Sequence, residues 1–317
     1  MWIVWTLLST AATLAILVLI TAFICFRMAF FVRRENQAEE DAKLPIPEGE
    51  EYEPYREQIV NWINEIRSMP RRAVEIRSHD GLRLAGYFYE YEKGAPIEIL
   101  FHGYRGNAER DLSGGVARCF SLGHSALIVD QRAAGQSEGN IITFGVLESR
   151  DCLAWTRFVV ENIDKDAKIV IGGISMGAAT VLMASTYDLP ENVVGVLADC
   201  GYTSAREIIK KVIREMKLPA DLLYPFVKLG ARIYGHFDLE EHSPIEAMKK
   251  CKLPVILLHG DGDDFVPHSM SLENFEACTS EKKRMVTISG AAHGLAFPAD
   301  KEKYLSELHE FFDPILK

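Results

Sequence analysis

A serine lies at the centre of the pentapeptide Gly-Ile-Ser-Met-Gly, residues 173–177. An apolar run typical of a buried strand precedes it over residues 168–173, and a helix-forming run follows over residues 178–185. A Gly-x-Ser-x-Gly between a strand and a helix is typical of a nucleophile elbow, a tight turn that exposes the serine hydroxyl above the sheet edge. The helix N-terminus adds free N–H groups and positive potential. The sequence therefore predicts Ser175 as a catalytic nucleophile.

A serine hydroxyl is a weak nucleophile at neutral pH, so it needs an imidazole base. That base in turn needs a carboxylate that fixes its tautomer and stabilises the imidazolium. After an elbow of this kind the acid and the histidine follow in that order along the chain. Among nine histidines, His293 alone follows the last expected strand and has small neighbours, in Gly-Ala-Ala-His-Gly over residues 290–294. We expect His293 to be the base.

The acid is expected in the loop after the penultimate strand, which reads HGDGDDFVP over residues 259–267. That loop offers three aspartates, and a fourth at the end of an earlier strand is in reserve because it could also reach the histidine. The candidates are Asp261, Asp263, Asp264 and, in reserve, Asp199. The loop superficially resembles a calcium loop, but Phe265 occupies the place of a third ligand. We therefore predict no metal site here.

Acyl transfer also needs N–H donors aimed at the oxyanion of the tetrahedral intermediate. The backbone N–H of Met176, directly after the nucleophile, is expected to supply one. The loop His-Gly-Tyr-Arg-Gly-Asn, residues 102–107, is expected to supply the second through the main chain of Tyr104. Arg105 in the same loop either contacts a polar substrate or is solvated.

Five motifs in sequence order make the chain, from residue 73 to its C-terminus, similar to serine hydrolases of the α/β-hydrolase superfamily. They are FHGYRGN at 101–107, DQRAAGQSEG at 130–139, GISMG at 173–177, HGDGDDFVP at 259–267 and GAAHG at 290–294. More narrowly, the chain resembles membrane-anchored bacterial hydrolases grouped with the serine aminopeptidase and prolyl-oligopeptidase-like sets. In that group the acid is the fifth residue of the HGxxD pattern, so the resemblance selects Asp263.

The resemblance also has consequences for the site's other parts. The second motif of the group reads D-x-R-G-x-G-x-S, and here Ala133 replaces its first glycine. That change affects the loop and leaves the triad untouched. The resemblance implies a Ser-His-Asp hydrolase that requires neither a cofactor nor a metal.

Eight apolar strands are expected to position these residues. Residues 73–78 and 84–90 flank a His-Asp-Gly turn and predict an antiparallel hairpin. Six further strands are separated by stretches long enough for crossover helices. They are expected at 97–101, 126–130, 168–173, 193–199, 255–259 and 285–289. The pattern predicts an α/β fold with a mostly parallel, doubly wound sheet and an antiparallel edge.

One connection, between residues 199 and 255, is longer than a crossover needs. Apolar stripes over 208–216 and 222–233 predict two helices within it. We interpret residues 202–250 as a helical lid, because an insertion at a strand's C-terminal end lies where open α/β sheets bind ligands. The alternative is two ordinary surface helices. The apolar composition of the lid favours an acyl substrate.

The N-terminal 26 residues carry no charge and are long enough, at ~1.5 Å per residue, to cross a hydrocarbon core of ~30 Å. They predict a transmembrane anchor over residues 1–34, with a cleaved signal peptide as the alternative. Three arginines follow the apolar run and none precedes it: Arg27, Arg33 and Arg34. The positive-inside rule then places the main domain on the cytoplasmic side of the cell membrane. Residues 35–72 are expected to be a juxtamembrane linker without chemistry that ends in an amphipathic helix.

The composition limits the possible partners. The chain of 317 residues is 48% hydrophobic and 25% charged, as in ordinary folded proteins. Its formal net charge is -10, which argues against a nucleic-acid partner because phosphates need a basic face. The expected partners are the membrane and a small acyl ester or short peptide.

Three functions follow from these observations. The first is a serine hydrolase of carboxylic esters that works through an acyl-enzyme in residues 73–317. The second is an aminopeptidase-type serine peptidase, in which Glu240 and Glu241 could hold the substrate ammonium. The third is a non-catalytic scaffold of the same fold.

Overall fold

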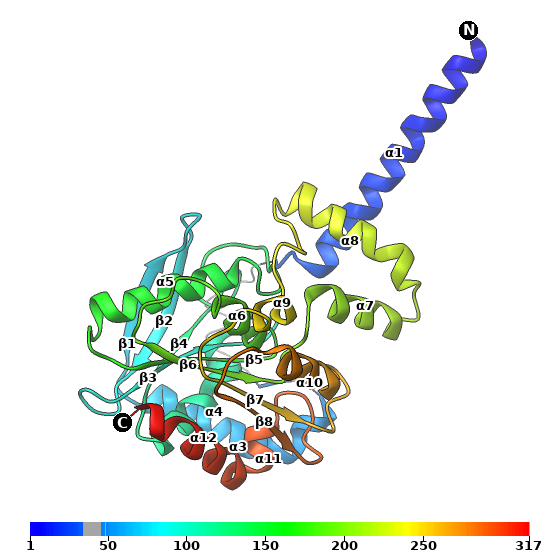
Figure 1. Cartoon of the computed structure of the whole chain (residues 1–317). Helices are drawn as coiled ribbons and strands as arrows, with labels where there is room; N and C mark the ends of the chain where they lie inside the picture. Colours follow the sequence, from blue (N-terminus) through cyan, green and yellow to red (C-terminus); the bar gives the residue numbers. More distant parts are fainter. Residues whose placement is uncertain (34–45, 48, 317) are drawn as a thin grey trace.

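The computed structural model describes residues 1–33, 46–47 and 49–316 and contains one eight-stranded sheet (Figure 1). The strand order is β1-β2-β4-β3-β5-β6-β7-β8. The strands are β1 Arg72–Arg77, β2 Arg83–Tyr89, β3 Ile97–Phe101, β4 Ser125–Val129, β5 Ile169–Ile174, β6 Val193–Asp199, β7 Val255–Gly260 and β8 Lys283–Ile288. All eight expected strands are present, with ends shifted by at most two residues.

The sheet has the predicted antiparallel edge. Strands β1 and β2 form a hairpin, β2 also runs antiparallel to β4, and every pairing from β4 through β3 to β8 is parallel. Crossover helices cover parallel strands on both faces, so the residues of these strands are mostly apolar. All five residues of β3 and of β4 are buried. The mostly parallel α/β sheet is thus confirmed.

Two helical layers cover the sheet (Figure 1). One layer packs the side chains of α5 Glu148–Asn162, α6 Met176–Ala184 and α10 His268–Ala277 against one face. The opposite layer consists of α3 Arg56–Ser68, α4 Ala108–Ser121, α11 Ala296–Ala299 and α12 Lys301–Leu316. Alternate residues of a strand point to opposite faces, so Ile171 joins the first layer and Val170 the second.

The predicted anchor is a single helix, α1 Trp2–Ala29, that projects from the body (Figure 1). Its mean hydropathy of 2.4 and its length are those of a helix that can cross a membrane, and a signal sequence would share both. Most of α1 is exposed, but Ala22 and Phe26 near its C-terminal end are buried. The linker residues 34–45 and 48 lie outside the described residues.

The end of α1 packs on the main domain. Phe31 forms an antiparallel β-bridge with Ile141, and the Val32 N–H donates to the Asn140 carbonyl at 2.8 Å. The ring of the buried Phe30 meets the ring of Phe144 edge to face, with centroids 5.8 Å apart. The bounds of anchor, linker and hydrolase domain stay predictions, but in this structure the helix end belongs to the same core as the sheet.

The long connection after β6 forms helices α7 Ala205–Glu215, α8 Ala220–Tyr234 and α9 Pro244–Met248. Helix α8 lies along the C-terminal half of α1 (Figure 1). The Tyr234 ring lies 5.2 Å from that of Phe23 and 5.8 Å from that of Phe26. The approach is so close at Gly230 that an added Cβ would overlap the Ala22 carbonyl. The apolar stripe of α8 therefore has a partner helix.

Candidate active site

The elbow holds Ser175 in a strained conformation directly after β5. Its φ of 56° and ψ of -115° lie in a region that residues other than glycine seldom adopt. A Cβ on Gly173 would overlap the backbone of Gly177, and a Cβ on Gly177 would overlap the Phe101 carbonyl. Both glycines of the motif are thus required by space. The Ser175 N–H donates to the Asp199 carbonyl at 2.8 Å and ties the turn to β6.

Two loops bring an imidazole and a carboxylate to this serine. His293 follows β8 and places its Nε2 atom 3.0 Å from Ser175 Oγ. Its Nδ1 atom lies 2.6 Å from Oδ2 of Asp263, which follows β7. The three residues therefore form a continuous hydrogen-bonded chain from serine to carboxylate. Proton transfer from a serine hydroxyl to an imidazole needs this geometry.

Asp263 is held as an anion by four donors. Its Oδ2 atom also lies 3.0 Å from His259 Nε2, and its Oδ1 atom accepts from the N–H groups of Phe265 and Val266. Burial alone would raise the pKa of Asp263, but the hydrogen bonds from His259 and His293 hold that pKa well below its ordinary value. His259 was not among the predicted site residues, although the first position of HGxxD pointed to it.

The other candidate acids have different partners. Asp261 accepts the Gly290 N–H at 2.5 Å and thereby joins the acid loop to the histidine loop. Asp264 is exposed, and Asp199 accepts the Tyr304 hydroxyl at 2.9 Å. The structure thus brings only Asp263, of the four aspartates, into hydrogen-bond contact with His293.

Ligand atoms of Cys200, Asp263 and His293 lie within 4.8 Å of one another, as a metal site would require. Asp263 and His293 are engaged with each other, and His293 also with Ser175. Burial raises the pKa of the Cys200 thiol well above its ordinary value, which disfavours the thiolate that binds metals. The donor set therefore fits a proton relay better than a cation.

The predicted oxyanion loop lies against the elbow. A Cβ on Gly103 would lie 3.6 Å from the Ser175 Cβ, so the loop passes close to the serine at the residue just before Tyr104. The Met176 N–H belongs to the first turn of α6, where amides have no partner within the helix. Arg105 does not face the serine, because its Nη2 atom donates to the Met28 carbonyl at the end of α1.

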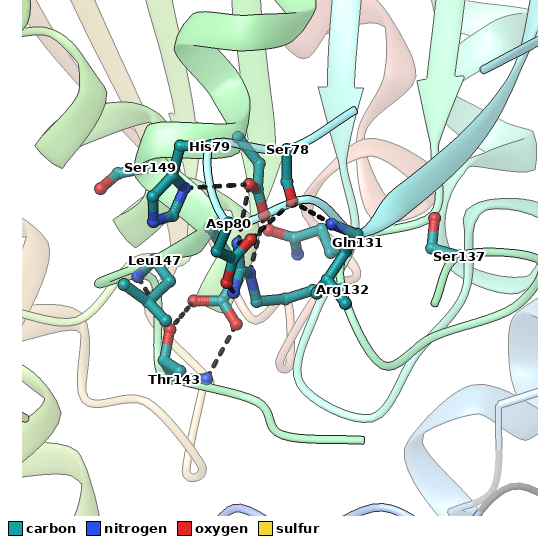
Figure 2. A network of polar contacts seen from close by, with 12 residues as sticks. Ser78, His79, Asp80, Gln131, Arg132, Ser137, Thr143, Leu147 and Ser149 are labelled. Carbon is teal, nitrogen blue, oxygen red and sulfur yellow. Dashed lines mark hydrogen bonds and ion pairs between the residues drawn. The ribbon is translucent and has the colours of Figure 1, made fainter. Parts of the chain in front are cut away.

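Residues 130–139 support the oxyanion loop from behind. Asp130 accepts the Ala108 N–H at 2.8 Å, and the Gln131 side chain donates to the His102 carbonyl at 2.7 Å. Arg132 pairs with Asp80 and Asp151 and so joins the β1–β2 turn to α5 (Figure 2). The substituted position, Ala133, has a φ of 63°, a left-handed conformation that favours glycine.

A cavity of about 260 Å³ reaches Ser175 and His293. Its remaining wall is mostly apolar and comes from η1 Glu50–Tyr55, from α3 and α4, and from strand residues beneath the elbow. These residues include Tyr52, Ile59, Trp62, Leu100, Ile174 and Leu197. No residue of 202–250 lines this cavity. The apolar stripe of α8 packs on α1, so the helical lid over residues 202–250 stays a prediction.

Tyr52 lines the cavity and contacts the histidine loop. Its hydroxyl donates to the His293 carbonyl at 3.1 Å, and burial raises its pKa well above the ordinary value, so it remains a donor. The Trp62 ring stacks on Phe297 with centroids 5.4 Å apart. The segment predicted to be a linker without chemistry thus contributes a wall of the site. A tyrosine in an acidic stretch gave no signal of this role.

The two glutamates considered for an ammonium site are engaged elsewhere. Glu240 accepts the Tyr224 hydroxyl and pairs with Lys228, whereas Glu241 pairs with Arg150. Neither glutamate lines the cavity.

Known proteins resemble the chain over most of its length. YqkD of Bacillus subtilis is 26% identical over 246 residues, which cover 77% of this chain and 80% of YqkD. Protein bem46 of Schizosaccharomyces pombe is 27% identical over 71% of this chain and 72% of its own. The human mitochondrial palmitoyl-protein thioesterase ABHD10 is 23% identical over 62% of this chain and 66% of its own.

Solved structures share the fold. The esterase Pf2001 of Pyrococcus furiosus superposes with a TM-score of 0.67 at 22% identity, covering 81% of this chain and 96% of the esterase. Mouse α/β hydrolase domain-containing protein 10 gives a TM-score of 0.56 at 20% identity, covering 77% and 99%. These likenesses identify the α/β-hydrolase fold.

The family comparison covers the part of the chain that carries the three hydrogen-bonded residues. The model of the prolyl oligopeptidase family matches residues 143–317, which include Ser175, Asp263 and His293. Because this match spans more than half of the chain, the protein belongs to the prolyl oligopeptidase family of α/β-hydrolases.

Proposed function

We propose that this protein is a serine hydrolase that cleaves carboxylic esters of acyl groups through Ser175, His293 and Asp263. The observation that carries the proposal is the unbroken chain of contacts from Ser175 Oγ through His293 to Asp263, at 3.0 and 2.6 Å. It is supported by an apolar cavity that reaches the same serine. The esterase and thioesterase names among the similar proteins agree with it.

The mechanism follows from the positions of the atoms. His293 Nε2 takes the proton of Ser175 Oγ as that oxygen attacks the ester carbonyl. The N–H groups of Met176 and Tyr104 stabilise the oxyanion, and His293 returns the proton to the leaving alcohol as the C–O bond breaks. Water, deprotonated by the same imidazole, then attacks the acyl-enzyme; the bond between the acyl carbon and Ser175 Oγ breaks, His293 returns the proton to Oγ, and the acid leaves. Asp263 stabilises the imidazolium throughout.

The strained backbone at Ser175 agrees with a catalytic role. Conformations of this kind persist where the surrounding structure over-determines them, and they cluster at active sites. At Ser175 the conformation is fixed by two glycines, at which any Cβ would overlap neighbouring backbone, and by the hydrogen bond from the Ser175 N–H to β6.

We further propose that α1 anchors the enzyme in the cell membrane with the hydrolase domain on the cytoplasmic side. Three arginines after the apolar run support this orientation through the positive-inside rule. Fusing a reporter that is active in only one compartment to the C-terminus tests it. Activity on the outer side alone would reverse the assignment.

A peptidase is the second candidate, because the family is named for one. The pairing of Glu240 and Glu241 with cations removes the ammonium site considered from the sequence. The deciding experiment uses the full chain in detergent with p-nitrophenyl acyl esters and peptidyl-amide substrates, beside Ser175→Ala. Ester turnover that is lost in the variant supports the esterase. Turnover of amides alone would establish the peptidase, and failure with both substrates and with a fluorophosphonate probe would contradict a working triad.

A further inference from the structure

Helix α8 has an exposed apolar stripe in addition to the residues that pack on α1. This outer stripe consists of Leu222, Pro225, Phe226, Leu229 and Ile233, whose helical spacing places them along one face. Leu222 is 64% exposed and Ile233 is 38% exposed, and the residues between them are exposed or half-buried. Single exposed apolar side chains are ordinary on a protein surface, but a continuous stripe of them marks a contact surface.

The outer stripe lies beside α1 and opposite the core. Gly230 and Tyr234 make contacts with α1, and Ala231, on another side of α8, is fully buried. At roughly 100° per residue, the centre of the outer stripe lies about 90° around α8 from the first two residues and about opposite Ala231. In Figure 1, α8 lies on the side of the body from which α1 projects. The outer stripe is therefore directed away from the body on the side where α1 leaves it.

The outer stripe adjoins the exposed apolar surface of α1. The Tyr234 hydroxyl donates to the Leu19 carbonyl at 3.1 Å, and its ring meets the Phe23 ring edge to face. Ile20 and Phe23 of α1 are both exposed. The apolar surfaces of the two helices therefore meet where they cross. Because α1 is the proposed membrane span, the material next to this crossing is lipid.

The segment that carries the outer stripe is basic. Residues 205–236 contain seven Lys or Arg and three Asp or Glu, a formal charge of +4 in a chain whose net charge is -10. In the turn between α7 and α8, Met216 and Leu218 are exposed on either side of Lys217. Helical surfaces that combine apolar side chains with Lys and Arg bind at the interface of anionic bilayers. The charge of this segment is thus complementary to anionic lipid headgroups.

We propose that α8 and the turn before it form a second membrane contact, in which the outer stripe, Met216 and Leu218 enter the interface of an anionic bilayer beside α1. The inference rests on the proposed anchoring by α1 and goes beyond it, because a span alone requires no contact between lipid and the body. Amphipathic helices of this kind lie with their apolar face about 5–10 Å deep at the boundary of headgroups and acyl chains. The outer stripe has that depth in this arrangement, and the cations remain among the headgroups.

The first test measures the depth of single side chains in a bilayer. The full chain is reconstituted in vesicles of phosphatidylcholine with about one third phosphatidylserine, and Leu222→Cys carries a nitrobenzoxadiazole label. The unsubstituted chain, whose six cysteines are buried or half-buried, gives the labelling background. We expect a nitroxide on the lipid acyl chain to quench more than about half of the emission from this label. No quenching would overturn the proposal.

Two further positions check that the result belongs to the outer stripe. Ile233→Cys, at the other end of the stripe, should be quenched as strongly as Leu222→Cys, which guards against a local effect of one substitution. Leu272→Cys is the matched control, because Leu272 is an exposed leucine on α10 in the body. The label there should lose less than about a tenth of its emission. Equal quenching at Leu272→Cys would mean that the body touches lipid without regard to the stripe, and would overturn the proposal.

A label at Ile16→Cys separates this inference from the proposed anchor. Ile16 lies in α1 ahead of the crossing with α8. Quenching at Ile16→Cys without quenching at Leu222→Cys leaves the anchor standing and overturns the second contact, whereas quenching at neither overturns both. Aqueous iodide identifies a protein partner in place of lipid. If Leu222→Cys is shielded from iodide but not quenched by the nitroxide lipid, another protein surface covers the stripe and the proposal fails.

The charge of the lipid is tested in the same vesicles. The nitroxide is placed either on phosphatidylserine or on phosphatidylcholine, at equal amounts of labelled lipid. We expect the labelled phosphatidylserine to quench Leu222→Cys at least about twofold more strongly, because the basic segment gathers anionic lipid around itself. Equal quenching by the two lipids would overturn the assignment of an anionic partner.

Discussion

Replacing Asp263 with asparagine probes the triad and its support together. Oδ2 of this carboxylate faces the nitrogens of His293 and His259, and Oδ1 faces the N–H groups of Phe265 and Val266. An asparagine has one oxygen and one NH2, so with both histidines donating as they do to the carboxylate, its NH2 meets two donors in either orientation. No rotation of the amide restores all four hydrogen bonds.

The expected magnitude has two parts. Each buried donor left without an acceptor costs ~1–3 kcal/mol, so Asp263→Asn should lower the free energy of unfolding by about 2–4 kcal/mol after relaxation. The activity falls further, because His293 loses the partner that fixes its tautomer and stabilises the imidazolium. Loss of this kind of partner lowers kcat by about 10³–10⁴-fold.

The assay measures ester hydrolysis per folded molecule, with the folded fraction taken from chemical denaturation in detergent. Asp264→Asn is the matched control, because it makes the same change at the next residue, whose side chain is exposed. The control should lose less than a factor of two in kcat. If Asp263→Asn keeps more than a tenth of the wild-type kcat, or if the control falls equally, Asp263 is not the acid that the geometry indicates.

Three further changes have expected outcomes. Ala133→Gly should raise the free energy of unfolding by about 0.5–1 kcal/mol in denaturant titrations, because φ is 63° there; a loss of stability would contradict the strain. Burial raises the pKa of Asp199 to about 6 from an ordinary 3.8, so ionisation of this carboxyl opposes folding. The free energy of unfolding of the wild type should therefore fall by about 3 kcal/mol, relative to that of Asp199→Asn, as the pH rises from 4 to 8. Parallel pH profiles of the two proteins would refute this. Gly230→Ala should separate α8 from α1 and cost about 1–3 kcal/mol in detergent, whereas the exposed Leu222→Ala should cost almost nothing; equal losses would mean that the helices do not depend on this contact.

The sequence was sufficient for the sheet and the elbow because both depend on local patterns. Strands such as β3 and β4 are short, mostly apolar runs between turn signals, and the glycines around Ser175 belong to one pentapeptide in which a larger residue would overlap neighbouring backbone. His293 was predicted because, of the two histidines that follow the last strand, it alone has small neighbours. Asp263 needed the family spacing, since three aspartates share that loop and local chemistry does not rank them.

The missing parts of the site depend on contacts between distant segments. Tyr52 meets the His293 carbonyl across 241 positions of sequence, and no period or motif marks such a pair. The stripe on α8 was correctly predicted as helical, but an apolar face does not state which surface it will cover. Its partner is α1, and a membrane span alone explains why α1 is hydrophobic. Nothing in the sequence therefore indicated that α1 also contacts protein.

The packing of α1 on the body fixes how the enzyme can face a bilayer. The residues of α1 ahead of Leu19 span about 25 Å, close to the thickness of one hydrocarbon core, and α8 contacts α1 from there on, since the Tyr234 hydroxyl donates to the Leu19 carbonyl. With α1 in a membrane, α8 lies at headgroup height, and the body can turn about the membrane normal but cannot swing on a tether. Every copy of the protein would then hold the cavity at the same height above the membrane and at the same tilt. Only substrates whose reacting group lies at that height would reach the cavity.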